Sequence, residues 1–245
     1  SRMTVRSQTR HKLSSWTIEA WVWPSNNAEG IVLRRAVSNW THGVWGVNYE
    51  LGVMTNAQFE LVPYAQYVGI TAGGAQAPVR LDGTGATEIL DGHQATLVIP
   101  AEQWSHLAAT YDPESSTFRL YVNGELATYR IDALEPTGLG LTEQHDYDSE
   151  LTVGGGFLVG VNVQEGFEGY LDEVLILGGV ASPERIRDDA SAGTALWASM
   201  ASASDTTPPT SLQLPIEEAL MHPHKPDELL VRFKPSVTPD MAAVV

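Results

Sequence analysis

Short runs of alternating apolar and polar residues extend from residue 16 to about residue 177, and Gly, Pro, Asn and Asp separate these runs. This two-residue period is typical of strands in an antiparallel sandwich or barrel. The run Thr17–Trp23 is apolar on both of its faces and stops at Pro24. It therefore predicts a strand that is buried on both sides.

Further strands are predicted downstream. The run Phe118–Ile131 contains Asn123-Gly124, a residue pair that favours a type I′ turn, and it predicts a β-hairpin. Leu151–Val153 is a short strand candidate. Gly169–Leu177 carries few polar residues on either face, so we expect it to be a central strand of a sheet.

The stretch between Asn26 and Gln103 is less regular. Gly and Ala are frequent between Gly69 and Gly92, which predicts long loops there. The arginines of the first 35 residues are scattered among hydrophobic positions, and we expect them to face water at strand edges: Arg2, Arg6, Arg10, Arg34 and Arg35.

The end of the alternating region carries a helix signal. Ser182 is a good N-cap and Pro183 suits the first helical position, so a short helix should run to about Ala190 and end the domain. From Ala198 to Pro215 the composition shifts to Ser, Ala, Thr and Pro, which is typical of a linker.

Beyond the linker, the segment Asp227–Val245 predicts a strand, a turn and the start of a helix capped by Thr238-Pro239. The length allows one large β-sandwich or two smaller domains. The expected division is a β-domain at 1–197, a linker at 198–226 and a separate segment at 227–245.

Composition narrows the classes of partner. Lys and Arg number 14 against 30 Asp and Glu, so the formal net charge is −16, and phosphate backbones would be repelled. The chain has no cysteine, which excludes disulfides and thiolate metal sites. No apolar run approaches the roughly 18 residues of a membrane helix. Residues 1–10 are too polar for a signal peptide, so we expect export to be encoded upstream or the chain to be a fragment.

Five segments, in this order, are similar to the laminin G-like (concanavalin A-like lectin/glucanase) family: WTIEAWVWP, WSHLAATYD, FRLYVNGE, ELTVGGG and FEGYLDEVLIL with ASPERI. The resemblance covers roughly residues 2–197. It implies an all-β fold, a two-sheet antiparallel jelly-roll sandwich with a concave face and a rim of variable loops. Two departures are a first strand that is absent or cut short and a long insertion between Pro24 and Trp104.

The tail from Asp227 onward resembles the opening of an inhibitor-type propeptide of subtilisin-like serine peptidases, whose first strand reads much like ELLVRFKP. This resemblance implies a peptidase downstream in the precursor, with the β-domain as its accessory or targeting module. The Asp-His-Ser triad itself is not expected in these residues.

The resemblance also implies a structural Ca²⁺ at Asp172, with backbone carbonyls as further oxygen ligands. The alternative is a carboxylate that caps a turn or pairs with an arginine. Asp146, Asp148 and Glu150 alternate in HDYDSE, so in an extended segment their carboxylates point the same way. Three readings stay open for them: a solvated acidic loop, a cation site, or the carboxylate pair of a retaining glycoside hydrolase.

Four aromatic residues fall in the insertion: Trp40, Trp45, Tyr64 and Tyr67. Their rings can stack on sugar faces, or they can fill the second half of the core, because WGVNYELGV alternates well enough to be a strand. Glu19 lies between tryptophans on an apolar strand and must be hydrogen-bonded or paired if it is buried. His106 is expected to be a core histidine with satisfied hydrogen bonds.

These observations predict a secreted or cell-surface, noncatalytic module that recognises polysaccharide or an extracellular protein. A fold does not fix a ligand, so the expectation depends on the family resemblance and on the lack of a convincing catalytic set. The alternatives are a jelly-roll glycoside hydrolase or polysaccharide lyase, and a mainly structural accessory domain of a secreted peptidase.

Overall fold

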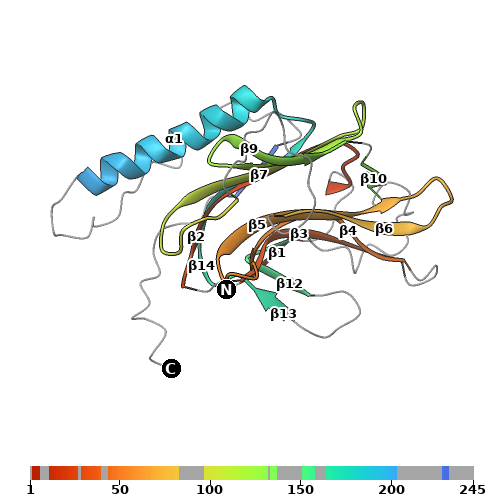
Figure 1. The fold of residues 1–245 in the computed structure, drawn as a ribbon, viewed down its shortest axis with the longest axis horizontal. Helices are drawn as coiled ribbons and strands as arrows, with labels where there is room; N and C mark the ends of the chain where they lie inside the picture. Colours follow the sequence, from red (N-terminus) through yellow and green to blue (C-terminus); the bar gives the residue numbers. More distant parts are fainter. Residues whose placement is uncertain are drawn as a thin grey trace.

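The computed structural model describes residues 2–5, 11–26, 29–39, 44–82, 97–131, 133–136, 151–157, 164–202 and 228–231. These residues form two antiparallel sheets that face each other, with a helix on one side and a short hairpin on the other (Figure 1). The all-β, two-sheet jelly-roll fold is therefore confirmed.

Sheet A has the strand order β1-β11-β3-β4-β5, and β6 and β10 both pair with β5. Its strands are β1 (Met3–Val5), β3 (Gly30–Asn39), β4 (Val44–Thr55), β5 (Leu61–Ile70), β6 (Gln76–Asp82), β10 (Glu135–Pro136) and β11 (Leu151–Val153). A two-stranded hairpin, β12 (Gly155–Phe157) with β13 (Gln164–Gly166), lies next to β3.

Sheet B has the strand order β15-β14-β2-β7-β8-β9. Its strands are β2 (Trp16–Pro24), β7 (Ser105–Asp112), β8 (Thr117–Val122), β9 (Glu125–Arg130), β14 (Gly169–Gly178) and β15 (Glu228–Val231). Strand β14 lies between β2 and β15, which confirms that this apolar run is a central strand. The predicted hairpin is also present as β8 and β9, with positive φ at Asn123 and Gly124.

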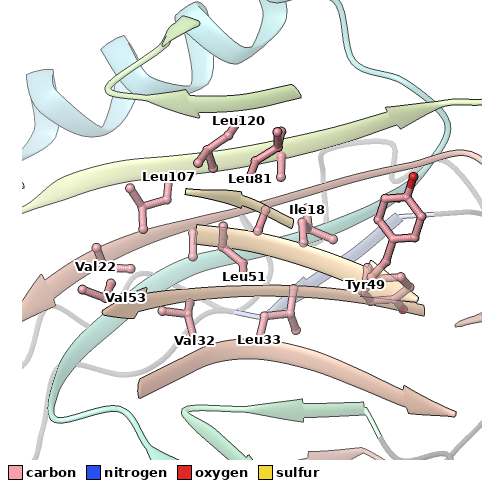
Figure 2. Close-up of a cluster of buried hydrophobic side chains, with 14 of the residues drawn as sticks. Ile18, Val22, Val32, Leu33, Tyr49, Leu51, Val53, Leu81, Leu107 and Leu120 are labelled. Carbon is pink, nitrogen blue, oxygen red and sulfur yellow. The ribbon is translucent and has the colours of Figure 1, made fainter. Parts of the chain in front are cut away.

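The core fills the space between the two sheets. Alternate residues of both sheets point into it, such as Ile18 and Leu107 from sheet B and Leu51 and Leu81 from sheet A (Figure 2). Trp16 is fully buried at its centre, and its ring centroid lies 5.6 Å from Phe118 and 5.9 Å from Tyr49. Large aromatic rings bury much apolar area, so this cluster anchors the two sheets to each other.

Helix α1 (Pro183–Ser202) covers the outer face of sheet B (Figure 1). The Ser182 hydroxyl accepts the backbone N–H of Arg185, as expected for an N-cap, and Ile186 packs on sheet B residues. Because the helix covers this side, β2 is buried on both faces, as its sequence predicted. The expected end near Ala190 is wrong, since the following Ala-rich residues are good helix formers and continue the helix to Ser202.

The segment between Pro24 and Trp104 is not an inserted set of loops. It supplies β3, β4, β5 and β6, the larger part of sheet A. The loop prediction for residues 69–92 is wrong for Gln76–Asp82, which forms β6. Gly69 lies within β5, where a Cβ would come within 2.4 Å of the Leu134 side chain, so this glycine permits a close approach rather than marking a loop.

Arg34 and Arg35 do not face water. They are 3% and 1% exposed, because β4 offers each of them a buried polar partner. Arg34 pairs with Glu50, and Arg35 donates to the Asn48 side chain at 3.3 Å. No helix within the described ranges is long and apolar enough to span a membrane.

Candidate functional site

A row of side chains crosses the outer face of sheet A, on the side opposite the core. Strand pairing sets them next to one another in the order Thr4, Thr152, Arg34, Glu50, Gln66 and Arg80. Their chain neighbours, such as Leu33 and Leu51, belong to the core, so strand alternation turns the row outward. Tyr64 and Asp82 form a second pair beside it. We call Arg34, Glu50, Tyr64, Gln66, Arg80 and Asp82 the outer strip.

Glu50 is the anchor of the outer strip. Its Oε2 forms an ion pair with Arg34, and its Oε1 accepts hydrogen bonds from the Tyr64 hydroxyl and the Gln66 amide, each at 2.8 Å. Glu50 is fully buried. A buried charge is tolerated when it is paired and hydrogen-bonded, so both carboxylate oxygens serve to hold the strip together.

Tyr64 links the buried and exposed ends of the outer strip. Its ring lies against Gly52 of β4, where a Cβ would come within 2.5 Å of ring atoms. The guanidinium carbon of Arg80 lies 4.1 Å from the ring centroid, which is a cation–π contact. Burial, and then the Glu50 carboxylate, raises the pKa of Tyr64 well above its usual value. The phenol therefore keeps its proton at neutral pH and remains a donor to Glu50.

The exposed end of the outer strip lies on β5 and β6. Arg80 donates to Asp82 Oδ2 at 2.7 Å and to Gln66 Oε1 at 3.3 Å. The Arg80 side chain is 36% exposed and that of Asp82 is 13% exposed. Two arginines face two carboxylates, so the formal charges of the strip cancel. The arrangement presents planar donors and acceptors whose orientation is already fixed, which lowers the entropic cost of binding a polar ligand.

The four aromatic residues expected to bind a ligand do not form one platform among the described residues. Tyr64 belongs to the outer strip and is 6% exposed, whereas Tyr67, three positions later, points to the opposite face of β5. Tyr67 is 1% exposed, and its hydroxyl donates to the backbone oxygen of Leu134 at 2.6 Å. It fills the core, the alternative that the sequence left open. Trp45 lies in β4 with its side chain outside the described part, and Trp40 lies outside the described residues.

The carboxylates expected to bind calcium are only partly described. Asp172 lies in β14, where its Oδ1 accepts the backbone N–H of Glu173 at 2.8 Å. Asp146 and Asp148, with Glu150, lie outside the described residues. Within the part of the chain that the structure describes, no group of three His, Cys, Asp or Glu side chains is placed to hold a metal ion.

Glu19 and His106 lie on the outer face of sheet B, under helix α1. Strand alternation puts them there, because Ile18 and Ala20 point into the core. Glu19 Oε2 lies 3.1 Å from His106 Nε2, and both side chains are almost completely buried. The expectation that a buried Glu19 is paired is therefore confirmed.

A family model described as the concanavalin A-like lectin/glucanases superfamily matches residues 1–187 of the chain. The chain belongs to this superfamily. No curated protein matches the sequence of this chain.

Several solved structures are similar to this chain at low sequence identity. The CBM40 of the IT-sialidase from Ruminococcus gnavus has a TM-score of 0.50 and 14% identity, over 78% of this chain and 98% of that chain. The SAP-like pentraxin from Limulus polyphemus has a TM-score of 0.49 and 12% identity, over 73% and 70% of the two chains. Domain 4 of the arabinanase AbnA from Geobacillus stearothermophilus has a TM-score of 0.42 and 16% identity, over 72% and 66%. Of these three, the CBM40 reaches a TM-score of 0.50, and at 14% identity this likeness shows a common fold and no more.

Of the six residues of the outer strip, the sequence pattern indicated Tyr64 as a candidate and not the other five. A signal for them was present, because Glu50 interrupts an apolar strand just as Glu19 does, and Arg34 does the same on the preceding strand. A charged residue buried in such a strand needs an ion-pair or hydrogen-bond partner, which a neighbouring strand can supply. The pairing register that joins them is set by long-range contacts, which the local pattern does not reveal.

Proposed function

We propose that this chain is a noncatalytic extracellular recognition module that binds polysaccharide on the outer strip of sheet A. The observation that carries the proposal is the fixed arrangement of Arg80, Gln66 and Asp82 beside the Tyr64 ring. Sugar hydroxyls both donate and accept hydrogen bonds, and planar side chains held in one orientation can bind them in pairs. The family description, which names lectins and glucanases, supports a carbohydrate as the ligand.

The charge balance of the outer strip favours a neutral glycan. The chain as a whole carries a formal net charge of −16, yet the strip holds as many arginines as carboxylates. A strongly anionic polysaccharide would be repelled by the overall field, while a neutral one would not.

Glu50 does not suit the role of a catalytic acid or nucleophile. Both of its oxygens are already bonded within the sheet, and its side chain is fully buried. Retaining glycoside hydrolysis needs two accessible carboxyl groups roughly 5 Å apart. This supports recognition over hydrolysis at the outer strip.

A glycan array tests the proposal with wild-type protein and the variant Arg80→Ala. We expect wild type to bind at least one neutral glycan, and Arg80→Ala to lose about tenfold or more in affinity, because a charge-assisted hydrogen bond is removed. Arg187→Ala is the matched control, since Arg187 is exposed on helix α1, away from sheet A.

Binding that Arg80→Ala leaves unchanged would contradict this site. Release of reducing sugar from the bound glycan would instead favour the alternative, a jelly-roll glycoside hydrolase or lyase. Failure to bind any glycan, together with binding to an extracellular protein, would reassign the module to protein recognition.

We further propose that the jelly roll is an accessory domain of a secreted subtilisin-like peptidase precursor. The expected division places the domain at 1–197, a linker at 198–226 and the start of a propeptide-like segment at 227–245. Strand β15 (Glu228–Val231) falls where the resemblance implied a first strand, and it pairs with β14 of the jelly roll. Sequencing the gene beyond residue 245 tests it, since the proposal requires an Asp-His-Ser triad downstream.

A structural calcium ion near Asp172 is also part of the proposal, by analogy with the family. Thermal unfolding with calcium and with a chelator tests it. The proposal requires calcium to raise the unfolding temperature of wild type and to have no effect on Asp172→Asn.

A further inference from the structure

A cavity lies between the outer face of sheet B and helix α1, and it shares no residue with the outer strip. Its volume is about 210 Å³, and its lining is Glu19, Trp21, His106, Glu173, Leu175, Asp189 and Ala192. An engineered protein cavity of roughly 150 Å³ is large enough to bind benzene. The cavity can therefore hold a small organic molecule.

Helix α1 forms one wall of this cavity. Gly193 allows the helix to approach sheet B closely, since a Cβ there would come within 2.3 Å of the Trp21 ring. The preceding turns of the helix bring Asp189 and Ala192 to the lining. The Asp189 carboxylate is thereby set over the buried Glu19–His106 pair of sheet B.

A β-bulge brings a third carboxylate to the cavity. The pairing of β14 with β2 shifts register between Asp172 and Leu175, and Glu173 within this bulge has φ of +47°. This left-handed backbone costs a non-glycine residue on the order of 1–3 kcal/mol, and bulges commonly redirect a side chain toward a functional site. Here the redirected side chain is Glu173, which lines the cavity.

The cavity wall contains buried polar atoms that lack hydrogen bonds. Glu19 is 2% exposed, and neither of its oxygens accepts a hydrogen bond from the described residues, although Oε2 contacts His106. The indole N–H of Trp21 and the Nδ1 of His106 are also buried without a hydrogen-bond partner within the described structure. Because buried polar groups are nearly always satisfied, an acceptor and a donor left open in one cavity indicate a polar occupant.

The charge of the lining is mostly negative. Three carboxylates surround the space, and a single histidine is the basic residue of the lining. Burial, and then the negative charge of Glu19, raises the pKa of Asp189 above its usual value, and an ion pair with Arg185 at 3.4 Å offsets part of this effect. A bound cation would relieve this repulsion.

We propose that this cavity binds a small amino alcohol. Its primary ammonium pairs with the acidic side chains of the lining, which are Glu19, Glu173 and Asp189, without contacting all three at once, and its hydroxyl oxygen accepts the indole N–H of Trp21. An organic cation fits better than a metal ion, since no three acidic or histidine side chains of the described residues are placed as metal ligands. Both ethanolamine and an amino sugar such as glucosamine carry this chemistry.

Isothermal titration calorimetry tests the proposal with ethanolamine and glucosamine as probes. We expect at least one of them to bind wild type, while glucose and N-acetylglucosamine, which lack the ammonium, do not. Glucosamine binding without ethanolamine binding identifies an amino sugar as the ligand, and comparable binding of both identifies a small free amine.

The variant Glu173→Gln should weaken binding about tenfold or more, because it removes one charge-assisted contact at a partly exposed position. Asp189→Asn, on the helix wall, should do the same and serves as a second variant if the first does not fold. Glu125→Gln is the matched control, since that carboxylate is 68% exposed on β9 and outside the cavity.

Absence of binding by both amines would overturn the proposal. It would also be overturned by equal binding of N-acetylglucosamine, or by affinities that Glu173→Gln and Asp189→Asn leave unchanged. Arg80→Ala should not alter amine binding, so failure here is distinct from failure of the polysaccharide site on sheet A.

Discussion

Charged side chains inside apolar strands form the centre of two buried polar clusters in this molecule. Glu19 and Glu50 each interrupt an apolar run, and each is buried with a basic partner on a neighbouring strand. The sequence pattern correctly indicated a partner for Glu19. The prediction that Arg34 faces water was wrong, because arginine is usually exposed and its partner, Glu50, lies 16 residues away in the sequence.

Glu50→Gln should destabilise the fold strongly. The change keeps the shape of the side chain but leaves Arg34 buried without its counter-ion, and breaking a buried pair in this way costs about 3–5 kcal/mol. Chemical denaturation measures the loss.

Glu60→Gln is the control for this prediction, because Glu60 is exposed and its change should stay within about 0.5 kcal/mol of wild type. An equally small effect of Glu50→Gln would show that the Arg34 pair is not a buried anchor.

The predicted secondary-structure elements are present where the sequence contains a specific turn or helix-capping residue. The Asn123-Gly124 hairpin and the Ser182 N-cap are both present as predicted. The end of helix α1 was missed, because a run rich in Ala and Ser suits a linker and a helix equally. Strand β6 was missed because glycines near it, such as Gly69 and Gly74, suggested loops, although Gly69 lies within β5 and permits close packing on Leu134.

Gly124→Ala should destabilise the β8–β9 turn and the helix above it. The residue has φ of +82°, and a Cβ would lie 3.0 Å from the Arg187 Cα of α1. The strained backbone costs about 1–2 kcal/mol, and the contact with α1 adds to it. The free energy of unfolding, measured by urea denaturation, gives the total.

Gly74→Ala separates the two causes. Gly74 has a similar φ of +79°, and nothing lies within 4 Å of its Cβ position. The cost of Gly124→Ala should exceed that of Gly74→Ala, and equal costs would show that the turn does not pack on the helix.

The molecule as a whole is a sandwich whose two outer faces differ. Helix α1 covers sheet B (Figure 1). The helix forms one wall of an acidic cavity there, whereas sheet A carries the outer strip. The sequence predicted the core of sheet B, whose strands are apolar on both faces. Of sheet A it predicted Leu151–Val153 and, as one alternative, a strand at WGVNYELGV. The rest was missed, because residues 24–104 looked like an insertion and their pairing depends on contacts distant in sequence.

Strand β15 ties the C-terminal region to the sandwich. It pairs with β14 through four residues, Glu228–Val231, and so becomes the edge strand of sheet B.

Hydrogen–deuterium exchange, measured with and without the strongest glycan from the array, tests polysaccharide recognition by the outer strip most directly. Bound glycan should slow exchange of the backbone amides of β5 and β6, which carry Gln66 and Arg80, and leave those of α1 unchanged. Protection confined to sheet B or α1, with β5 and β6 unaffected, would contradict the account.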